Sequence, residues 1–431
     1  MTRGQRTNDF DGARPLAPQD TVSGFVENQT SPAALSRNVI LLFAAACGLS
    51  VANIYYAQPL LDAMARDFAI SPASIGIVVT VTQIGYALGL LFIVPLGDFL
   101  DRRRLIVMQS VASALALAVV GLAPTAGVLL TGMVAVGLLA VAVQVLVAFA
   151  ASLAAPAQRG KIVGTVTSGI VLGILLARFV AGLLADLGGW RSVYLASAFL
   201  TLLMAILLLR VLPHHKTKNP AMSYPELLRS TVLLFVEEPI LRVRAVIAML
   251  IFGTFSVLWT SMVLPLSAPP FSLSHTEIGL FGLAGVAGAL AAGRAGYLAD
   301  RGWSQWTTGV SLALMLAAWI LIAMAGISLW ALVAGVVILD LAVQAVHVTN
   351  QSMILAVRPA AGSRLIGGYM VFYSIGSASG SIASTMVYAW AGWLGVCILG
   401  AAMSGVALLF WAATRHVAQA ATGREAADIV R

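Results

Sequence analysis

The stretch GDFLDRRRL, residues 97 to 105, lies between two long apolar runs. A weaker copy, GYLADRG, stands at residues 296 to 302. Two further pairs follow in the same order: AVQV at 142–145 with AVQA at 342–345, and LGGWRSV at 187–193 with WAGWLGV at 390–396. Three matches in one order, each separated by about 200 residues, predict an internal repeat. The chain therefore consists of two related halves.

The composition predicts a protein of the membrane. Of the 431 residues, 60% are hydrophobic and only 10% are charged, whereas soluble domains carry about 25% charged residues. Apolar stretches of at least about 18 residues recur along the chain, and each is long enough to cross the hydrocarbon layer as a helix. These stretches do not alternate apolar and polar residues as barrel strands do. We therefore expect an all-α membrane protein.

Twelve transmembrane helices are expected, six in each half. They fall at about 38–60, 74–96, 105–123, 127–153, 162–185, 192–212, 243–266, 276–297, 306–325, 329–355, 366–388 and 394–414. The domains would be a disordered cytoplasmic tail at 1–37, a six-helix bundle at 38–212, a cytoplasmic central loop at 213–242, a second six-helix bundle at 243–414 and a tail at 415–431. Six spans return the chain to its starting side, so the halves form a parallel repeat. In transporters of this plan the binding site lies between the halves.

The basic residues predict the orientation. With a cytoplasmic N-terminus, 22 of the 25 Lys and Arg residues fall on the cytoplasmic side. Arg66 and Arg191 fall outside, and Arg178 lies within a span. This asymmetry follows the positive-inside rule and predicts that both termini are cytoplasmic. Attraction of these loops to anionic lipid accounts for the net charge of +8, so no nucleic-acid partner is expected.

The residue types of the repeated loop indicate structural roles for it. Gly97 allows two helices to approach closely, and Asp101 can cap a helix or bind an arginine across the halves. The alternative is a loop of solvated charges, and the second copy of the loop argues against it. We expect a conformational switch formed by Gly97, Asp101, Arg102, Arg104, Gly296, Asp300 and Arg301.

These residues carry a resemblance to a known family. From about residue 38 to 415 the chain resembles a bacterial member of the major facilitator superfamily, whose loop motif is Gly-x-x-x-Asp-Arg followed by basic residues. Arg104 stands where that motif usually has a glycine. ANIYYAQPLL in the first span and LGILLAR…GGWR around the fifth are similar to a proton-linked efflux subgroup. The resemblance implies two six-helix bundles, alternating access and a place in the bacterial inner membrane, and we expect a monomer.

The fifth span departs from one pattern of that family. Its antiporters often carry Gly-x-x-x-Gly-Pro-x-x-Gly-Gly there. Gly169 and Gly173 fit, but Ile174 replaces the proline, and Ala177 and Arg178 replace the last glycines. The departure weighs against proton antiport and leaves transport itself unaffected.

The tenth span carries a polar stripe. Asp340 is the only acid near the middle of a span, where a charge costs at least about 2.5–3.5 kcal/mol. Asp340, Gln344, His347 and Gln351 share one helix face. Such a stripe suggests a wet cavity with proton coupling by Asp340 and His347. The alternative is a hydrogen-bonded seam that serves packing only.

Arg178 in the fifth span is the second charged candidate. Its guanidinium can bind an anionic substrate group or a carboxylate such as Asp340. The alternative is a side chain that reaches back to the outer interface.

Other polar and aromatic residues are candidates for the wall of a substrate cavity, although such residues often serve packing alone. Tyr55 and Gln58 form a second pair on a face next to that of Asn53 and Tyr56. The cavity candidates are Asn53, Tyr56, Gln83, Tyr86, Gln144, Arg178, Trp259, Gln344, Gln351, Tyr369 and Tyr373.

No pattern in the sequence indicates an enzyme, a cofactor or a metal site. The phosphate-binding GxxxxGK[ST] motif is absent, and Cys47 and Cys397 lie inside apolar runs without metal-ligand spacing. We predict a secondary active transporter that exports a small amphipathic or sugar-like molecule coupled to protons. The alternatives are uptake of a small organic anion bound by Arg178 and a non-transporting membrane sensor with the same fold.

Overall fold

The computed structural model describes residues 36–154, 158–213, 223–285, 294–298, 301–358 and 361–429. Every regular element in these ranges is helical. The elements of the N-terminal half are α1 Arg37–Tyr55, η1 Gln58–Leu60, α2 Leu61–Phe68, α3 Ile77–Phe92, η2 Val94–Asp98, α4 Arg102–Gly121, α5 Ala126–Ala140, α6 Ala142–Leu153, α7 Arg159–Gly188 and α8 Trp190–Val211. Then follow α9 Tyr224–Glu237, α10 Pro239–Ser261, α11 Val263–Ser267, α12 His275–Leu280, η4 Phe281–Ala284, α14 Ser304–Ala323, η5 Met324–Gly326, α15 Leu329–Val357 and α16 Gly362–Ile429.

The described helices confirm the expected all-helical membrane fold. Ten of them are long and apolar enough to cross a membrane. The helix α16 holds the two expected last spans, because it bends at Gly392, where φ is 62°. The expected eighth span begins with α12 and continues through η4, and its residues 286–293 lie outside the described residues.

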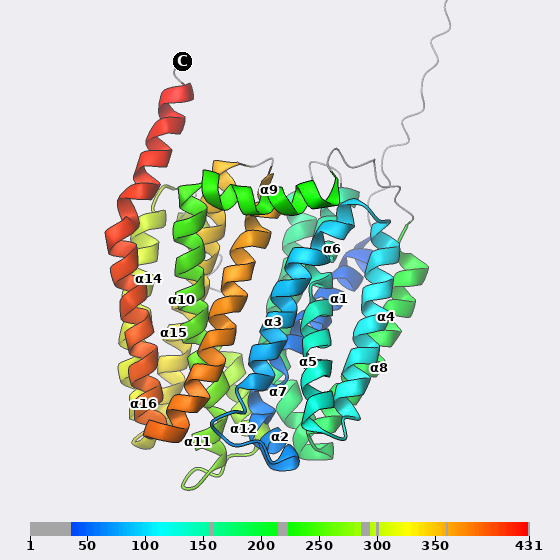
Figure 1. Ribbon diagram of the computed structural model, residues 1–431, viewed down its shortest axis with the longest axis vertical. Helices are drawn as coiled ribbons and strands as arrows, with labels where there is room; N and C mark the ends of the chain where they lie inside the picture. The colour runs from blue at the N-terminus through cyan, green and yellow to red at the C-terminus, as the bar shows by residue number, and fades with distance from the viewer. Residues whose placement is uncertain are drawn as a thin grey trace, which may run out of the picture.

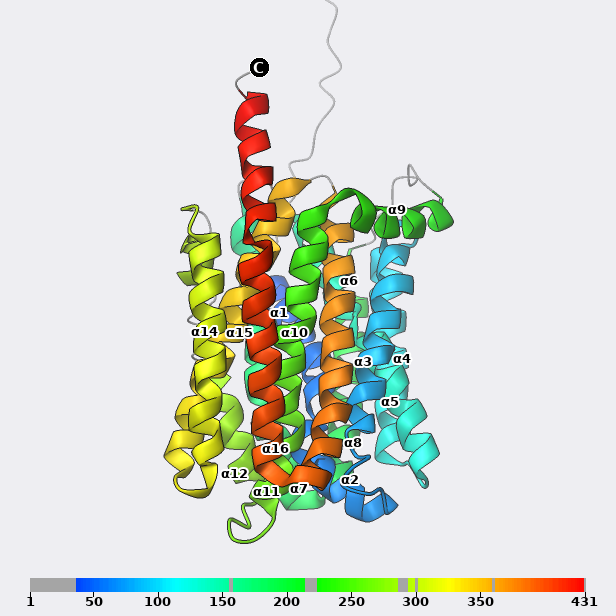
Figure 2. The ribbon, with the colours of Figure 1, turned by 60° about the vertical axis from the view of Figure 1, so that its left-hand side comes forward.

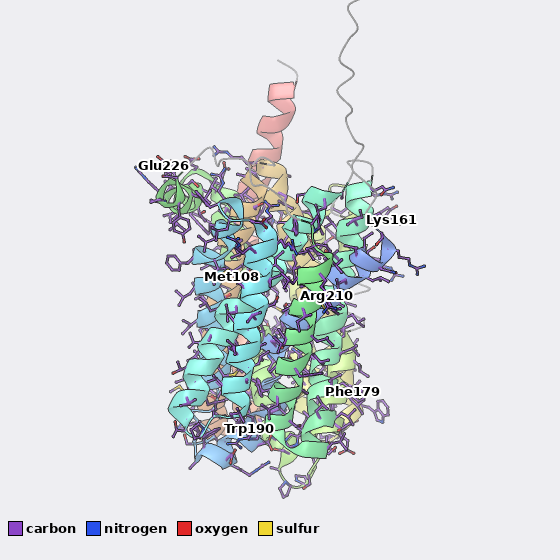
Figure 3. All side chains as sticks on the ribbon, turned by 90° about the vertical axis from the view of Figure 1, so that its right-hand side faces the viewer. Met108, Lys161, Phe179, Trp190, Arg210 and Glu226 are labelled. Carbon is purple, nitrogen blue, oxygen red and sulfur yellow. The ribbon has the colours of Figure 1, made fainter. Side chains whose placement is uncertain are left out.

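The spans run between two ends of the bundle, which Figure 1 shows at the top and the bottom. We call the end that carries α9 and the C-terminus the tail end, and the end that carries α2, α11 and α12 the far end. Exposed apolar side chains such as those of Met108, Phe199 and Ile320 form a belt between them. In Figure 3, Lys161 and Glu226 lie toward the tail end and Trp190 lies at the far end.

The two halves repeat the same helix packing. In the first half α1 packs along α7, and in the second half α10 packs along α16. A Cβ atom on Gly173 would come within 2.3 Å of the backbone oxygen of Gly48, and one on Gly380 within 2.3 Å of that of Gly253. Glycine at these positions lets the helix backbones touch. The equivalent contacts support the parallel repeat.

The halves meet directly in the part of the bundle nearer the far end. There α12 packs against α7, and α3 packs against α16. Thr80 donates a hydrogen bond to the backbone oxygen of Ala378 (2.9 Å), and Thr385 donates one to that of Ala73 (3.0 Å). The far end is therefore closed.

Near the tail end, the helix α9 connects the halves, and Figures 1 and 2 show it lying across the ends of the spans. Tyr224 donates a hydrogen bond to the backbone oxygen of Phe92 (2.8 Å) in the first half. At its other end, α9 contacts Arg358 and Arg364 of the second half. The linker helix therefore bridges the two bundles.

Candidate functional site

An acid and a base from different halves lie on the same indole ring. Asp340 of α15 is 4% exposed, and its Oδ1 accepts a hydrogen bond of 3.1 Å from Nε1 of Trp259 in α10. Arg178 of α7 is 2% exposed, and its guanidinium carbon lies 3.8 Å from the centroid of the Trp259 ring. Nε of Arg178 also donates to Oε1 of Gln58 (2.7 Å). We call Gln58, Arg178, Trp259 and Asp340 the central cluster.

The Trp259 ring and the opposite charges of Arg178 and Asp340 offset part of the cost of burying these two groups away from water. A desolvated cation over an indole face gains about 2 kcal/mol, and the nearby carboxylate adds an attraction of opposite charges. Nη2 of Arg178 is buried and has no hydrogen-bond partner among the described residues. The N–H groups of Nη2 are therefore hydrogen-bond donors of the cluster that bind no other described residue.

Glycines in α12 and η4 bring this part of the second half onto Arg178. A Cβ atom on Gly279 would come within 2.5 Å of the Arg178 backbone oxygen, and one on Gly282 within 3.0 Å of its Cβ. A Cβ atom on Gly285 would lie 3.6 Å from Oδ2 of Asp340. Glycine at these positions therefore allows the two halves to close over the central cluster.

The space left beside the cluster is small. A cavity of about 10 Å³ is lined by Gln58, Pro59, Arg178, Trp259, Met262, Val263 and Ile278. That volume is close to the minimum that one water molecule needs. A molecule larger than water does not fit in this cavity between the described residues.

Tyrosines form a second contact between the halves. The hydroxyl groups of Tyr55 in α1 and Tyr373 in α16 are 2.8 Å apart. The Tyr86 ring of α3 meets the Tyr373 ring edge to face, with centroids 6.4 Å apart. Nε2 of Gln144 donates to the hydroxyl of Tyr86 (3.4 Å). Gln83 is buried on the same helix as Tyr86, and its Oε1 has no partner among the described atoms.

The structure therefore brings several cavity candidates together. Tyr86, Gln144, Arg178, Trp259 and Tyr373 lie in or beside the contact between the halves. From the first span it is Tyr55 and Gln58 that reach this contact.

Asn53 and Tyr56, in contrast, face the interior of the first half. Oγ of Ser197 in α8 donates to Oδ1 of Asn53 (2.7 Å). The Tyr56 ring packs edge to face on Tyr194 of the same helix, with centroids 6.5 Å apart. Their contacts are with α8, away from the central cluster.

The polar stripe of α15 divides between two environments. Asp340 joins the central cluster, whereas Nδ1 of His347 lies 2.9 Å from the hydroxyl of Tyr369. Nε2 of Gln351 lies 3.2 Å from Nε2 of His347. Gln344 lies between the two groups and is half-buried.

Arg244 of α10 completes this second group, and the sequence analysis missed it. The side chain is 1% exposed and donates to Oδ1 of Asn350 (3.2 Å) and Oγ1 of Thr308 (3.3 Å). Asn350 in turn donates to the Tyr369 hydroxyl (3.5 Å). Arg244 stands at the edge of an apolar run and was counted as a cytoplasmic loop charge. Its position inside the predicted span 243–266 was the available signal.

The repeated loop contains a helix cap. Oδ1 of Asp101 accepts a hydrogen bond of 3.2 Å from the backbone nitrogen of Arg104, at the start of α4. Nε of Arg102 donates to the backbone oxygen of Gly97 (3.0 Å). In the second copy, the Arg301 guanidinium stacks near Tyr297, in the helical segment that also holds Gly296, and Asp300 lies outside the described residues. The expected conformational switch stays a prediction.

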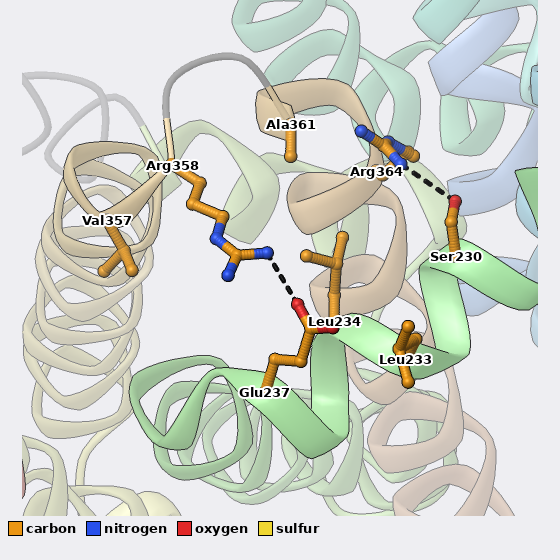
Figure 4. A pocket seen from close by; sticks show the side chains of 8 residues that line it. All are labelled: Ser230, Leu233, Leu234, Glu237, Val357, Arg358, Ala361 and Arg364. Atoms are coloured by element: carbon orange, nitrogen blue, oxygen red, sulfur yellow. Dashed lines mark hydrogen bonds and ion pairs between the residues drawn. The ribbon is translucent and has the colours of Figure 1, made fainter.

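A larger cavity opens at the tail end, between α9, α15 and α16 (Figure 4). Its volume is about 530 Å³. Arg358 forms an ion pair of 2.6 Å with Glu237, and Arg364 donates to Ser230 (2.9 Å). These contacts tie the linker helix to the second half.

Comparison with known proteins identifies the family. A sequence profile of the Major Facilitator Superfamily matches residues 40–323. The chain belongs to the Major Facilitator Superfamily. This major facilitator protein is 49% identical over 387 residues to the uncharacterized transporter YgaY of Escherichia coli O157:H7. The alignment covers 90% of this chain and 98% of that protein. It is 26% identical over 310 residues to the inner membrane transport protein YnfM of Escherichia coli K12, with 69% of this chain and 72% of that protein covered.

A solved structure supports the fold of this major facilitator protein. It is a bacterial homologue of the human lysosomal transporter Spinster in an inward-facing and unoccupied conformation, with a TM-score of 0.75, 14% identity and coverage of 89% and 98% of the two chains. The resemblance inferred from the repeated loop is confirmed. The protein is a multi-pass membrane transporter of the major facilitator fold, with twelve helices in two related bundles.

Proposed function

We propose that this transporter exports a small amphipathic molecule in exchange for protons, with Asp340 as the proton site. The observation that carries the proposal is the central cluster. It places the acid of one half and the arginine of the other on one indole ring, at the point where the halves separate.

A proton on Asp340 changes the attraction between the halves. An ionised Asp340 attracts Arg178, which belongs to the other half, whereas a protonated Asp340 does not. An unpaired charge at this depth is costly, so the two charged groups favour the conformation that keeps them together. Gain and loss of the proton can therefore bias the alternation of the two bundles. The proton acts here as a ligand: a ligand that binds one of two conformations better shifts the population toward that conformation.

The surroundings of Arg178 suggest the class of substrate. Its guanidinium lies among the rings of Tyr55, Phe255 and Trp259, at 3.8 to 5.4 Å from their centroids. When the halves part, aromatic walls with one cation suit a molecule that has an apolar body and a polar or anionic group. Nη2 of Arg178, which has no hydrogen-bond partner among the described residues, also favours a second candidate, the uptake of a small organic anion.

We further propose that the tail end faces the cytoplasm of a bacterial cell and that the protein works as a monomer in the inner membrane. Lys161 and Arg210 lie toward the tail end in Figure 3, and Arg358 and Arg364 lie there because they contact the linker helix α9. Arg66 belongs to α2 and Arg191 pairs with Asp67 of α2, at the far end, which supports this orientation. The name of the relative YnfM, an inner membrane transport protein, supports a place in the inner membrane.

Flux into everted membrane vesicles over a panel of amphipathic compounds, sugars and organic anions tests the proposal. An exporter should accumulate its substrate in such vesicles only while a proton gradient is maintained. Collapse of the gradient by a protonophore should abolish accumulation. Accumulation that survives the protonophore, or that occurs only in right-side-out vesicles, would contradict proton-coupled export.

A further inference from the structure

A histidine at the far end holds two acids from the other half. His275 is the first residue of α12, and its Nε2 lies 3.0 Å from Oδ1 of Asp62 in α2. Its Nδ1 lies 3.1 Å from Oδ1 of Asp186 in α7. Asp186 also accepts the backbone N–H groups of His275 (3.2 Å) and Thr276 (2.8 Å). We call His275, Asp62 and Asp186 the far-end clamp.

The geometry of the clamp depends on the charge of the ring. A neutral imidazole carries one N–H, whereas the charged ring carries two. Ionised carboxylates only accept hydrogen bonds. Each ring nitrogen of His275 faces a carboxylate oxygen, so only the charged ring can donate to both. A neutral ring would turn a lone pair toward one of the two acids.

The surrounding charges support this reading. Asp62 also binds Arg66 of its own helix (2.9 Å), and Glu277 of α12 caps the backbone of Ser274. The hydrogen bond to Asp62, followed by the charge of Asp62 and the contacts with Asp186, raises the pKa of His275 above its usual value, against partial burial that lowers it. The His275 side chain is 19% exposed, so it can exchange protons with the solution.

We propose that His275 is a second proton site, separate from the central cluster, and that a proton bound there locks the far end shut. The sign follows from the raised pKa. The stabilisation of the closed far end is fully present below about pH 6.5, the usual pKa of histidine, and is lost as the pH rises through the raised pKa. Opening separates the ring from both acids, so an open far end favours the neutral ring.

In the orientation proposed above, the clamp responds to the pH outside the cell. Protonation from outside would favour closure of the far end, and therefore the state that faces the cytoplasm. A proton-driven exporter must return to that state after it releases its substrate. The clamp would then act as a trigger for the return, while Asp340 carries the coupled proton.

Distances between spin labels test the clamp. Leu187→Cys and Ile327→Cys place labels on exposed positions next to the far end in different halves, in a background with Cys47→Ala and Cys397→Ala. In purified protein in lipid nanodiscs, the short distance should dominate at pH 5. The long distance should gain population as the pH rises above about 6.5.

Four variants make the test decisive. His275→Gln should abolish the gain of the long distance with rising pH, because ionisation of Asp340 acts in the opposite direction and draws the halves together. Asp62→Asn should move the step to lower pH because His275 loses its main acceptor. Asp67→Asn breaks an ion pair with Arg191 at the same end but inside one half, so it should leave the step unchanged. Asp340→Asn should also keep the step. Persistence of the step in His275→Gln, or its loss in Asp340→Asn alone, would overturn the proposal, because the opening with rising pH would then not come from His275.

Discussion

The far end and the tail end of the molecule hold the two halves together in different ways. At the far end, helices of one half touch helices of the other, with backbone atoms in close approach and a histidine clamped by two acids. At the tail end, the linker helix α9 bridges the bundles through Tyr224 and through the ion pair of Arg358 with Glu237.

This difference shows which contacts must change during transport. A major facilitator protein works by moving its two bundles about a site between them. The direct contacts of the far end, such as those of Thr80 and Thr385, must break for that end to open. The far end is therefore the lock of this conformation, whereas the tail-end contacts named above all pass through the linker helix.

The largest effect is expected for Gly182→Leu. A Cβ atom on Gly182 would come within 2.1 Å of the backbone oxygen of His275, and α12 would have to shift to accommodate it. Overpacking of this kind costs typically about 1–3 kcal/mol, which changes the ratio of open to closed far ends about 5- to 150-fold. Distances between the labels at residues 187 and 327 should lengthen, and transport should fall sharply.

A variant on the same helix provides the control for Gly182→Leu. Gly164 of α7 has no atom near the position of an added Cβ, so Gly164→Leu should leave the distances and the transport close to wild type. Equal effects of the two variants on distances and transport would mean that leucine in α7 perturbs the protein for reasons unrelated to the far end.

A smaller effect is expected for Tyr373→Phe. The substitution removes one hydrogen bond between the halves, of 2.8 Å to Tyr55, and leaves the ring in place. Such a bond contributes about 0.5–1.5 kcal/mol, so the same label distances should show a 2- to 13-fold shift toward the open far end. Tyr297→Phe, at an exposed tyrosine, should show no shift. A wild-type distance distribution in Tyr373→Phe would show that the hydrogen bond between Tyr55 and Tyr373 does not help to keep the far end closed.

The smallest effect is expected for Arg358→Gln at the tail end. The variant breaks the ion pairs of Arg358 with Glu237 and Glu238. The Arg358 side chain is 49% exposed, and exposed ion pairs contribute little. The ratio of open to closed far ends should change by less than about threefold. A change larger than that of Tyr373→Phe would show that the tail end also acts as a lock.

The overall fold was predictable because its signals are local. Apolar runs, the repeated loop at Gly97 and Gly296 and the asymmetry of basic residues are all visible without knowledge of packing. Asp340 was identifiable for the same reason, because an acid in the middle of an apolar run is costly wherever the helix packs.

The finer parts of the site depend on contacts between distant segments. Tyr55 and Asn53 lie on neighbouring faces of α1, and only the packing of that helix against α8 decides which of them meets the other half. Arg244 was missed because the depth of a residue at the edge of a span cannot be read from an apolar run. The clamp of His275 joins residues 213 positions apart, and nothing in the sequence near either residue indicates their contact.

The central claim is that Asp340 couples proton movement to the alternation of the halves. Transport by Asp340→Asn, in proteoliposomes with and without a proton gradient, tests it most directly. Asparagine keeps the shape of the side chain and can still accept the hydrogen bond from Trp259, but it cannot bind and release a proton. The account predicts that the variant no longer accumulates substrate against its gradient while it still exchanges substrate downhill. Accumulation at the wild-type level with normal proton dependence would contradict the account and would make Asp340 a structural residue.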